Sequence, residues 1–225
     1  MSWISAIAIE PLDAPIVTHE PETATSIVLC PASGMAAVVG PRPTATYSAG
    51  SPGTRVRLRL APGRAAALFG IPVADLAGRI VPVSELWGDA QVRDLVRDPI
   101  GTLARRADRR EPNSDLVAEA ARLLAEGRSV QATADRLHLS ERYLRTLFTG
   151  AVGLSPKTFA RVERVRAVLA RVGGRDLARL AAELGYYDQS HLTNEFRAVM
   201  GVPPAAYAHG RLPNPTRCQS NRTRQ

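Results

Sequence analysis

The chain has 225 residues, enough for one or two domains, with 45% hydrophobic residues, 22% charged residues and a formal net charge of +8. This composition is typical of a soluble globular protein and excludes collagen-like and wholly disordered chains. No run approaches the roughly 18 consecutive apolar residues of a membrane span, and two cysteines cannot form a disulfide framework. The N-terminus lacks a basic signal-peptide region, so we expect a cytoplasmic protein without a membrane partner.

Residues 1–110 are predicted to form a small mixed α/β domain of regulatory or sensor-like type. Short apolar runs at 25–30 and 35–39 indicate buried strands, and the segment 54–61 alternates strictly between apolar and basic residues. Its arginines, Arg55, Arg57 and Arg59, share one face, which we expect to be a solvated sheet edge. Residues 64–111 indicate short helices broken by prolines, and Trp87 among them is expected to be core. The charged, proline-bearing segment 107–113 is typical of a linker.

The pattern becomes strongly helical from Ser114, and this half also carries most of the charge. Residues 113–225 hold 17 basic and 10 acidic side chains, whereas residues 1–112 hold 12 basic and 11 acidic. A basic surface attracts phosphates and releases their counterions, so the charge favours a nucleic-acid partner. Residues 114–209 are predicted to form an all-α domain, and residues 211–225, which contain almost nothing to bury, to be a disordered tail.

The segment 129–148 predicts a helix-turn-helix. Ser129 caps a short helix, and Ser140 caps a second one after a tight turn. Tyr143, Leu144, Leu147 and Phe148 form an apolar stripe on this second helix. Its other side is polar and basic.

The same pattern recurs at 176–196. Leu184 matches Leu137 at an offset of 47, and after one inserted turn residue Phe196 matches Phe148 at an offset of 48. Gly185 supplies the turn, where a positive φ costs it little, and Asp188 is the expected N-cap. Each motif is followed by G-x-x-P, and this duplication makes a chance match improbable.

Residues 156–172 between the motifs predict one amphipathic helix about 25 Å long. We expect it to act as a rigid strut that lets both second helices enter adjacent major grooves of one duplex. Its arginines at 161, 164, 166 and 171 are expected to point largely outward.

The chain resembles the AraC/XylS family of bacterial transcription regulators. The resemblance rests on LSERYLRTLF, GLSPKTFARVERVRAVL and AAELGYYDQSHLTNEFRAVMGVPPAAY, which together span about 115–207. The string RLRLAPGRAAALFGIPVADLAGRIVPVSELWG is similar to a short subgroup with a compact N-terminal domain of unassigned role. The implied fold is α+β, with a small mixed α/β N-terminal domain and an all-α C-terminal domain of two helix-turn-helix motifs joined by a linker helix.

The resemblance implies a sequence-specific, double-stranded DNA-binding regulator that reads promoter or operator DNA. The family pattern places base contacts on the exposed faces of the two second helices, at Arg142, Arg145, Thr146, Gln189, Ser190, Thr193 and Asn194. Contacts to the phosphate backbone are expected from Ser140, Lys157, Arg161 and Arg197. RNA polymerase and an unidentified small-molecule effector are further expected partners.

Two alternatives remain open at this point. The helical domain could locate an enzyme on DNA, or it could be a protein-interaction module that uses the domain only for docking. We predict no enzyme, no cofactor and no metal, because Cys30 and Cys218 stand alone and the common catalytic and phosphate-binding motifs are missing. Binding to DNA with sequence preference and steep salt dependence would distinguish the regulator from the interaction module.

Overall fold

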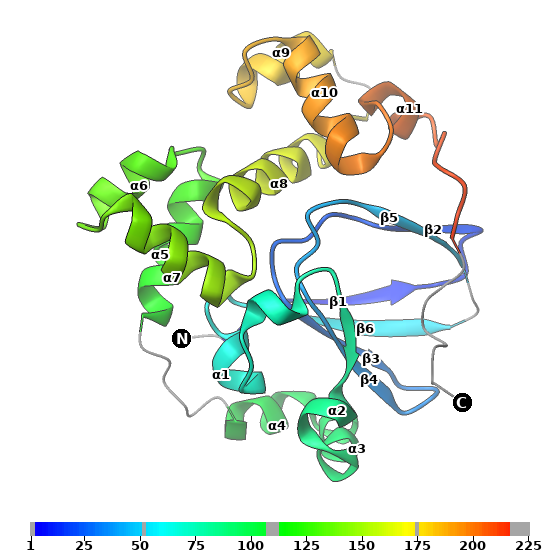
Figure 1. Ribbon diagram of the computed structural model, residues 1–225. Coiled ribbons are helices and arrows are strands. Elements are labelled where there is room, and N and C mark those ends of the chain that lie inside the picture. Colours follow the sequence, from blue (N-terminus) through cyan, green and yellow to red (C-terminus); the bar gives the residue numbers. More distant parts are fainter. Residues whose placement is uncertain (1–2, 51–52, 107–112, 174–175, 217–225) are drawn as a thin grey trace. The chain divides into compact units, whose positions relative to one another are not determined.

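The computed structural model describes residues 3–50, 53–106, 113–173 and 176–216, and it confirms the predicted α+β class. Strands dominate up to residue 60, and helices follow, ending with the two helix-turn-helix motifs (Figure 1). Among these described residues, no helix combines the length and the apolarity that a membrane crossing requires.

A five-stranded sheet forms the core of the N-terminal region. Its strands, in spatial order, are β1 (Ile4–Pro11), β6 (Thr54–Leu60), β3 (Ser26–Cys30), β4 (Met35–Val39) and β7 (Ile80–Pro82). The central strand β3 pairs antiparallel with both β6 and β4, and Ile27 lies opposite Leu58 on one side and Val38 on the other. All three side chains are almost fully buried, which fixes the register because a one-residue slip would turn them to the opposite face.

The arginine face of β6 is not the solvated edge that the alternation predicts. Strand β6 lies between β1 and β3, and the side chains of Arg55 and Arg57 are only 14% and 13% exposed. Their Nε atoms lie 2.5 and 2.8 Å from the carboxylate of Glu10 on β1, and Arg59 pairs with Glu22 at 3.0 Å. Burial tends to raise the pKa of Glu10, but the hydrogen bonds and charges of Arg57 and Arg55 outweigh it and hold this pKa below its ordinary value.

Short helices complete this core. They are α1 (Ala65–Phe69), the 3-10 helix η1 (Val73–Leu76), α2 (Val83–Trp87), α3 (Asp89–Arg97) and α4 (Pro99–Arg106). Their apolar side chains join those of the sheet in one buried cluster. Trp87 is a core residue, as predicted, and its ring stacks on Phe69 with centroids 5.3 Å apart.

Seven further helices follow within the described ranges 113–173 and 176–216. They are α5 (Ser114–Ala125), α6 (Val130–Arg136), α7 (Glu141–Val152), α8 (Pro156–Leu169), α9 (Leu177–Glu183), α10 (Gln189–Met200) and α11 (Pro204–Ala208). Side chains of α5, α6 and α7, with Phe159 of α8, form one apolar cluster. Those of α9 and α10 form another with Val165 and Val168 of α8. Each helix-turn-helix therefore has its own core, and α8 contributes to both.

The compact units of the structure do not follow the predicted boundary at 110–114. One unit comprises residues 1–10, 22–43 and 54–163, and so joins the five-stranded sheet to the first helix-turn-helix. The other comprises residues 11–21, 44–53 and 164–225, and joins the second motif to a two-stranded ribbon of β2 (Ile16–His19) and β5 (Thr46–Ala49). Helix α8 passes from the first unit into the second after Glu163.

Hydrogen bonds explain why the ribbon belongs with the second motif. The Tyr47 hydroxyl donates to the carbonyl of Met200 at 2.6 Å, and the amide of Ala45 donates to the carbonyl of Val199 at 2.8 Å. Thr216, in the segment predicted to be a disordered tail, donates its amide to the carbonyl of Tyr47 at 2.9 Å. The rest of that segment, 217–225, lies outside the described residues.

The glycines that end α7 and α10 test how the end of α7 packs against η1. Gly153 and Gly201 both have a positive φ, 81° and 76°. A Cβ at Gly153 would lie 2.8 Å from the carbonyl oxygen of Val73 in η1, whereas one at Gly201 would meet nothing closer than 3.8 Å. We expect Gly201→Ala to cost about 1–2 kcal/mol of stability through backbone strain alone, and Gly153→Ala to cost more. Urea unfolding of both variants measures the difference, and an equal or smaller loss at Gly153 would contradict this packing.

Candidate nucleic-acid interface

The first helix-turn-helix is built from α6 and α7. The Ser129 hydroxyl accepts a hydrogen bond from the amide of Ala132 at 3.0 Å and begins α6. The Ser140 hydroxyl accepts one from the amide of Tyr143 at 3.2 Å and begins α7. Between them His138 adopts a positive φ of 54°, which reverses the chain within a few residues. The N-caps predicted from the sequence are therefore the ones that define this motif.

The second motif repeats these features with α9 and α10. Asp176 caps α9, and Asp188 caps α10 by accepting the amide of His191 at 2.7 Å. Gly185, which matches His138 at the offset of 47, has the predicted positive φ, 71°. The repeat seen in the sequence is thus a repeat of local backbone structure.

Each second helix separates an apolar face from a polar one. On α7, Leu144 and Phe148 are almost fully buried, and on α10 so are Leu192 and Phe196. The predicted base-contacting residues lie on the opposite faces. Arg142, Arg145, Thr146, Gln189, Ser190 and Asn194 are exposed, and Thr193 is half-buried. Both polar faces are therefore available to a partner, although their contacts with bases stay a prediction.

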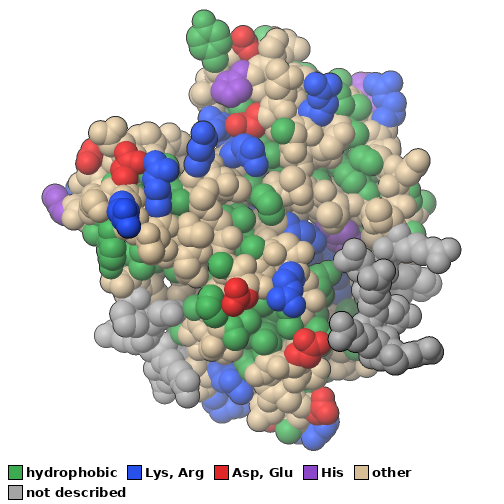
Figure 2. All heavy atoms as spheres, in the orientation of Figure 1, with side chains coloured by type: hydrophobic (Ala, Val, Ile, Leu, Met, Phe, Trp, Pro, Cys, Tyr) green, Lys and Arg blue, Asp and Glu red, His purple; other side chains and the backbone are tan. Residues whose placement is uncertain are grey.

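Local interactions hold some of these side chains without burying them. The Arg145 guanidinium lies 2.6 Å from the Glu141 carboxylate one turn earlier, and the Thr146 hydroxyl donates to the carbonyl of Arg142 at 3.1 Å. An exposed pair of this kind contributes only about 0.3–0.5 kcal/mol, so Arg145 can exchange Glu141 for a nucleic acid at little cost. Figure 2 shows both basic and acidic side chains over the helices of the first motif.

The predicted backbone-contacting residues differ in accessibility. Lys157 in the first turn of α8 and Arg197 on α10 are exposed, as is Ser140. Arg161 is half-buried, and its Nε has no hydrogen-bond partner among the described residues. The expectation that the arginines of α8 point outward is wrong for two others. Arg164 pairs with Glu195 at 3.1 Å, and Arg166 donates to the carbonyl of Pro21 at 3.3 Å.

Two tyrosines near the recognition helices were missed as candidate contacts. Tyr143, placed on the apolar stripe by its spacing, is 48% exposed, and Tyr187 is 93% exposed. Tyr187 directly precedes the cap of α10 and falls at the single inserted residue of the second motif. The insertion could have identified Tyr187 from the sequence. A residue without an equivalent in the first motif has no matching place in the packed core, so it is expected at the surface.

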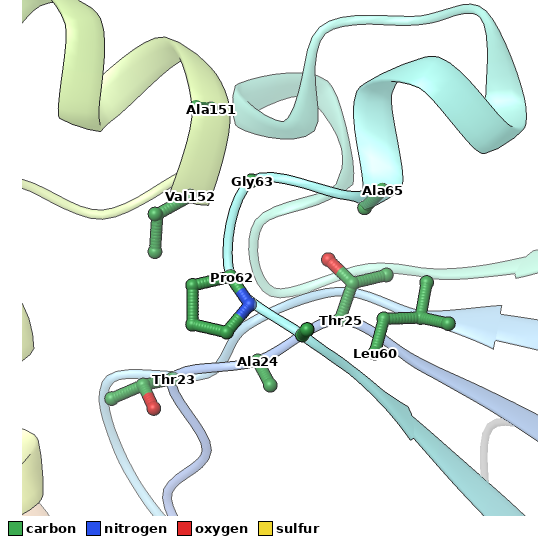
Figure 3. Close-up of a pocket in the computed structure, with 10 residues that line it drawn as sticks. Thr23, Ala24, Thr25, Leu60, Pro62, Gly63, Ala65, Ala151 and Val152 are labelled. Atoms are coloured by element: carbon green, nitrogen blue, oxygen red, sulfur yellow. The ribbon is translucent and has the colours of Figure 1, made fainter. Parts of the chain in front are cut away.

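A small pocket in the first unit is lined by ten residues. It lies where the starts of β3 and α1 and the end of β6 approach Ala151 and Val152 at the end of α7 (Figure 3). Its volume is about 10 Å³, which suffices for one water molecule and not for an effector. No group of three or more metal-ligating side chains occurs among the residues that the structure describes.

A helix-turn-helix domain family matches residues 133–210. This range begins within α6 and contains all of α7 to α11, so it covers both recognition helices. No curated protein matches the chain.

Solved structures were also found to be similar to parts or most of this chain. The C-terminal domain of AraT, a response regulator from Geobacillus stearothermophilus, is 18% identical, with a TM-score of 0.42, over 50% of this chain and 98% of that chain. The DNA-binding domain of AdpA, a global transcriptional factor in complex with a target DNA, is 26% identical, with a TM-score of 0.39, over 45% and 93%. ToxT from Vibrio cholerae is 8% identical, with a TM-score of 0.47, over 91% and 96%.

Ser140 allows its capping role to be separated from its predicted role toward phosphate. Its hydroxyl accepts from the Tyr143 amide and still has a proton to donate. In Ser140→Asp the cap is kept and stability should stay within about 0.5 kcal/mol, but a negative charge would face the phosphate. Ser140→Ala should instead lose about 1 kcal/mol of stability. Thermal unfolding and DNA titration of both variants measure the two roles. Unimpaired binding by Ser140→Asp would remove this residue from the interface.

Proposed function

We propose that this chain, whose residues 133–210 match a helix-turn-helix domain family, is a DNA-binding transcription regulator of the AraC/XylS type that inserts α7 and α10 into adjacent major grooves of one duplex. The observation that carries the proposal is that α7 and α10 each have one buried apolar face and one exposed polar face. Each buries an apolar stripe in its own core and leaves exposed a face of polar and basic side chains at matching positions. A major groove accommodates an α-helix presented in this way.

The exposed side chains have the chemistry that base reading requires. The guanidinium groups of Arg142 and Arg145 can each bind O6 and N7 of a guanine with two hydrogen bonds. The amides of Gln189 and Asn194 can pair in the same manner with N6 and N7 of an adenine. The first motif is thus suited to G·C pairs and the second to A·T pairs. We infer an operator whose two half-sites differ in base composition in this sense.

Helix α8 supports simultaneous binding by both motifs. It is continuous over 14 residues, or about 21 Å at 1.5 Å per residue, and it contributes side chains to the cores of both motifs. A helix without an internal proline or glycine is a stiff connection. We propose that it keeps the recognition helices at a spacing compatible with one helical turn of DNA.

The same proposal assigns phosphate contacts to the residues around these helices. Lys157 and Arg197 are exposed cations, and Ser140 and the amide groups at the start of α7 can donate to phosphate oxygens. Tyr143 and Tyr187 add exposed hydroxyl groups beside the recognition helices. We further propose RNA polymerase as the partner of the DNA-bound protein. The five-stranded sheet region, packed with the first motif, is proposed as the regulatory part that responds to an effector.

Substitutions on the exposed faces test the base contacts. We expect Arg145→Ala and Asn194→Ala each to weaken specific binding by about 1–3 kcal/mol and to relax base preference at one half-site each. Lys157→Ala should weaken binding to all sequences alike, because phosphates carry no sequence information. Fluorescence-anisotropy titrations against selected and randomised duplexes compare the three variants. Unchanged affinity and base preference in both Arg145→Ala and Asn194→Ala would contradict the assignment and favour the protein-interaction role.

The spacing of the motifs is tested independently by footprinting. Hydroxyl-radical cleavage of a bound operator should show two protected segments on one face of the duplex, about 10 base pairs apart. Arg145→Ala should weaken protection of one segment and Asn194→Ala of the other. A single protected segment affected by both substitutions would show that the motifs do not bind adjacent grooves.

A further inference from the structure

The two helix-turn-helix motifs differ at a pair of positions that are equivalent in the repeat. The first motif has Leu139 and Leu147, which pack against its apolar cluster. The second motif has Tyr186 at the offset of 47 and Glu195 at the offset of 48. An apolar pair in one copy is therefore replaced by a hydroxyl and a carboxylate in the other, with Tyr186 just before α10 and Glu195 in its middle.

Arg164 of α8 completes a polar cluster with these two residues. Its Nε lies 3.1 Å from Oε1 of Glu195, and its guanidinium carbon lies 5.1 Å from the centre of the Tyr186 ring. The cluster is largely screened from solvent, with side-chain exposures of 34% for Arg164 and 12% for Glu195, and Tyr186 is buried. We call Arg164, Tyr186 and Glu195 the α8–α10 cluster.

The electrostatics of the cluster are consistent with close contact. Burial raises the pKa of Tyr186 well above its ordinary value, and the negative charge of Glu195 raises it further. The phenol therefore remains protonated and available as a donor at neutral pH. Arg164 acts in the opposite direction, because its positive charge favours the phenolate. One cation thus faces both an aromatic ring and a carboxylate.

Such a cluster constrains orientation more strongly than apolar packing does. Apolar contacts are non-directional and tolerate small rotations, whereas one guanidinium that pairs with a carboxylate and also lies over an aromatic ring restricts where both partners can lie. Glu195 is adjacent to Asn194 on α10, so a rotation that breaks the pair also moves the predicted base contact. A half-buried ion pair adds little net stability, but loss of one partner leaves an uncompensated charge.

We propose that the α8–α10 cluster is the positioning device of the second recognition helix. It fixes how α10 sits on α8, and so how Gln189 and Asn194 meet the bases, while α7 is positioned by apolar packing alone at the equivalent place. The proposal rests on the proposed function, because it concerns how one of the two helices reads DNA. Arg164, Tyr186 and Glu195 are positioning residues and do not touch DNA.

The test uses the full chain and three duplexes: the selected operator, and two versions with one half-site randomised. Glu195→Gln keeps the shape of the side chain and removes its charge. We expect about tenfold weaker binding to the operator and to the duplex that keeps only the second half-site. Binding to the duplex that keeps only the first half-site should not change. The double variant Arg164→Glu/Glu195→Arg restores opposite charges and should recover most of the loss.

A matched control is available on α9. Arg179 and Glu183 form an exposed ion pair at 3.0 Å in the same unit, so Glu183→Gln should leave binding to all three duplexes unchanged. Circular dichroism and the melting temperature of each variant separate misfolding from reorientation. Rescue by the charge-reversed pair is a readout that a purely local loss of packing would not give.

The outcomes distinguish this proposal from the one on which it depends. If the wild type binds all three duplexes equally, the proposed function fails. If the wild type depends on both half-sites and Glu195→Gln, folded as the wild type, weakens neither of them selectively, only the positioning role fails. Equal weakening at both half-sites, or absence of rescue by the folded double variant, would also overturn the positioning role.

Discussion

The burial of one apolar stripe on each recognition helix is the constraint on which the rest of the protein depends. Leu144 and Phe148 on α7, and Leu192 and Phe196 on α10, are almost completely removed from solvent. Burying such side chains contributes about 1.5–3 kcal/mol each, more than any exposed ion pair or single cap on these helices. Their burial leaves each helix only one face to present. The same burial that stabilises each helix therefore also determines which of its polar residues are exposed.

Much of the C-terminal half could be predicted from the sequence, because its information is local. The caps Ser129, Ser140 and Asp188 each accept a hydrogen bond from the amide three residues on, and Gly185 in the second turn acts through its own φ. Helical periodicity likewise connects residues within one or two turns. The exposed faces of α7 and α10 follow from these features, and the residues expected there are accessible, with Thr193 half-buried.

The N-terminal region was harder to predict, because its structure depends on pairing between distant segments. The alternation of 54–60 identified a strand correctly but not its place in the sheet. Its arginines are screened because β1, some 45 residues earlier in the chain, pairs beside them and supplies Glu10. Nothing in the alternation distinguishes an arginine facing water from one facing a carboxylate on the next strand. The same applies to Arg164, whose partner Glu195 belongs to another helix.

The two compact units also revise how the chain is divided. Sequence composition changes near residue 110, where the charged, proline-bearing segment 107–113 precedes the strongly helical pattern that begins at Ser114. This change does not separate structural units, because the first motif packs with the sheet, where α7 contacts η1, and the second motif packs with the β2–β5 ribbon. Helix α8 is shared between them. The two recognition helices therefore have different supports, since α7 packs with the sheet region and α10 packs with the ribbon.

The composition of the second unit has a consequence for synthesis of the protein. The unit is assembled from residues 11–21, 44–53 and 164–225, so its ribbon leaves the ribosome long before the helices that it joins. The Tyr47 hydroxyl cannot donate to the carbonyl of Met200 until the 153 residues that separate them have been translated. During that interval the sheet region has all its strands and can begin to fold on its own, because domains generally form as units during elongation. The second unit therefore completes its fold after the first, because its ribbon lacks α10 as a partner until residues 189–200 have been made.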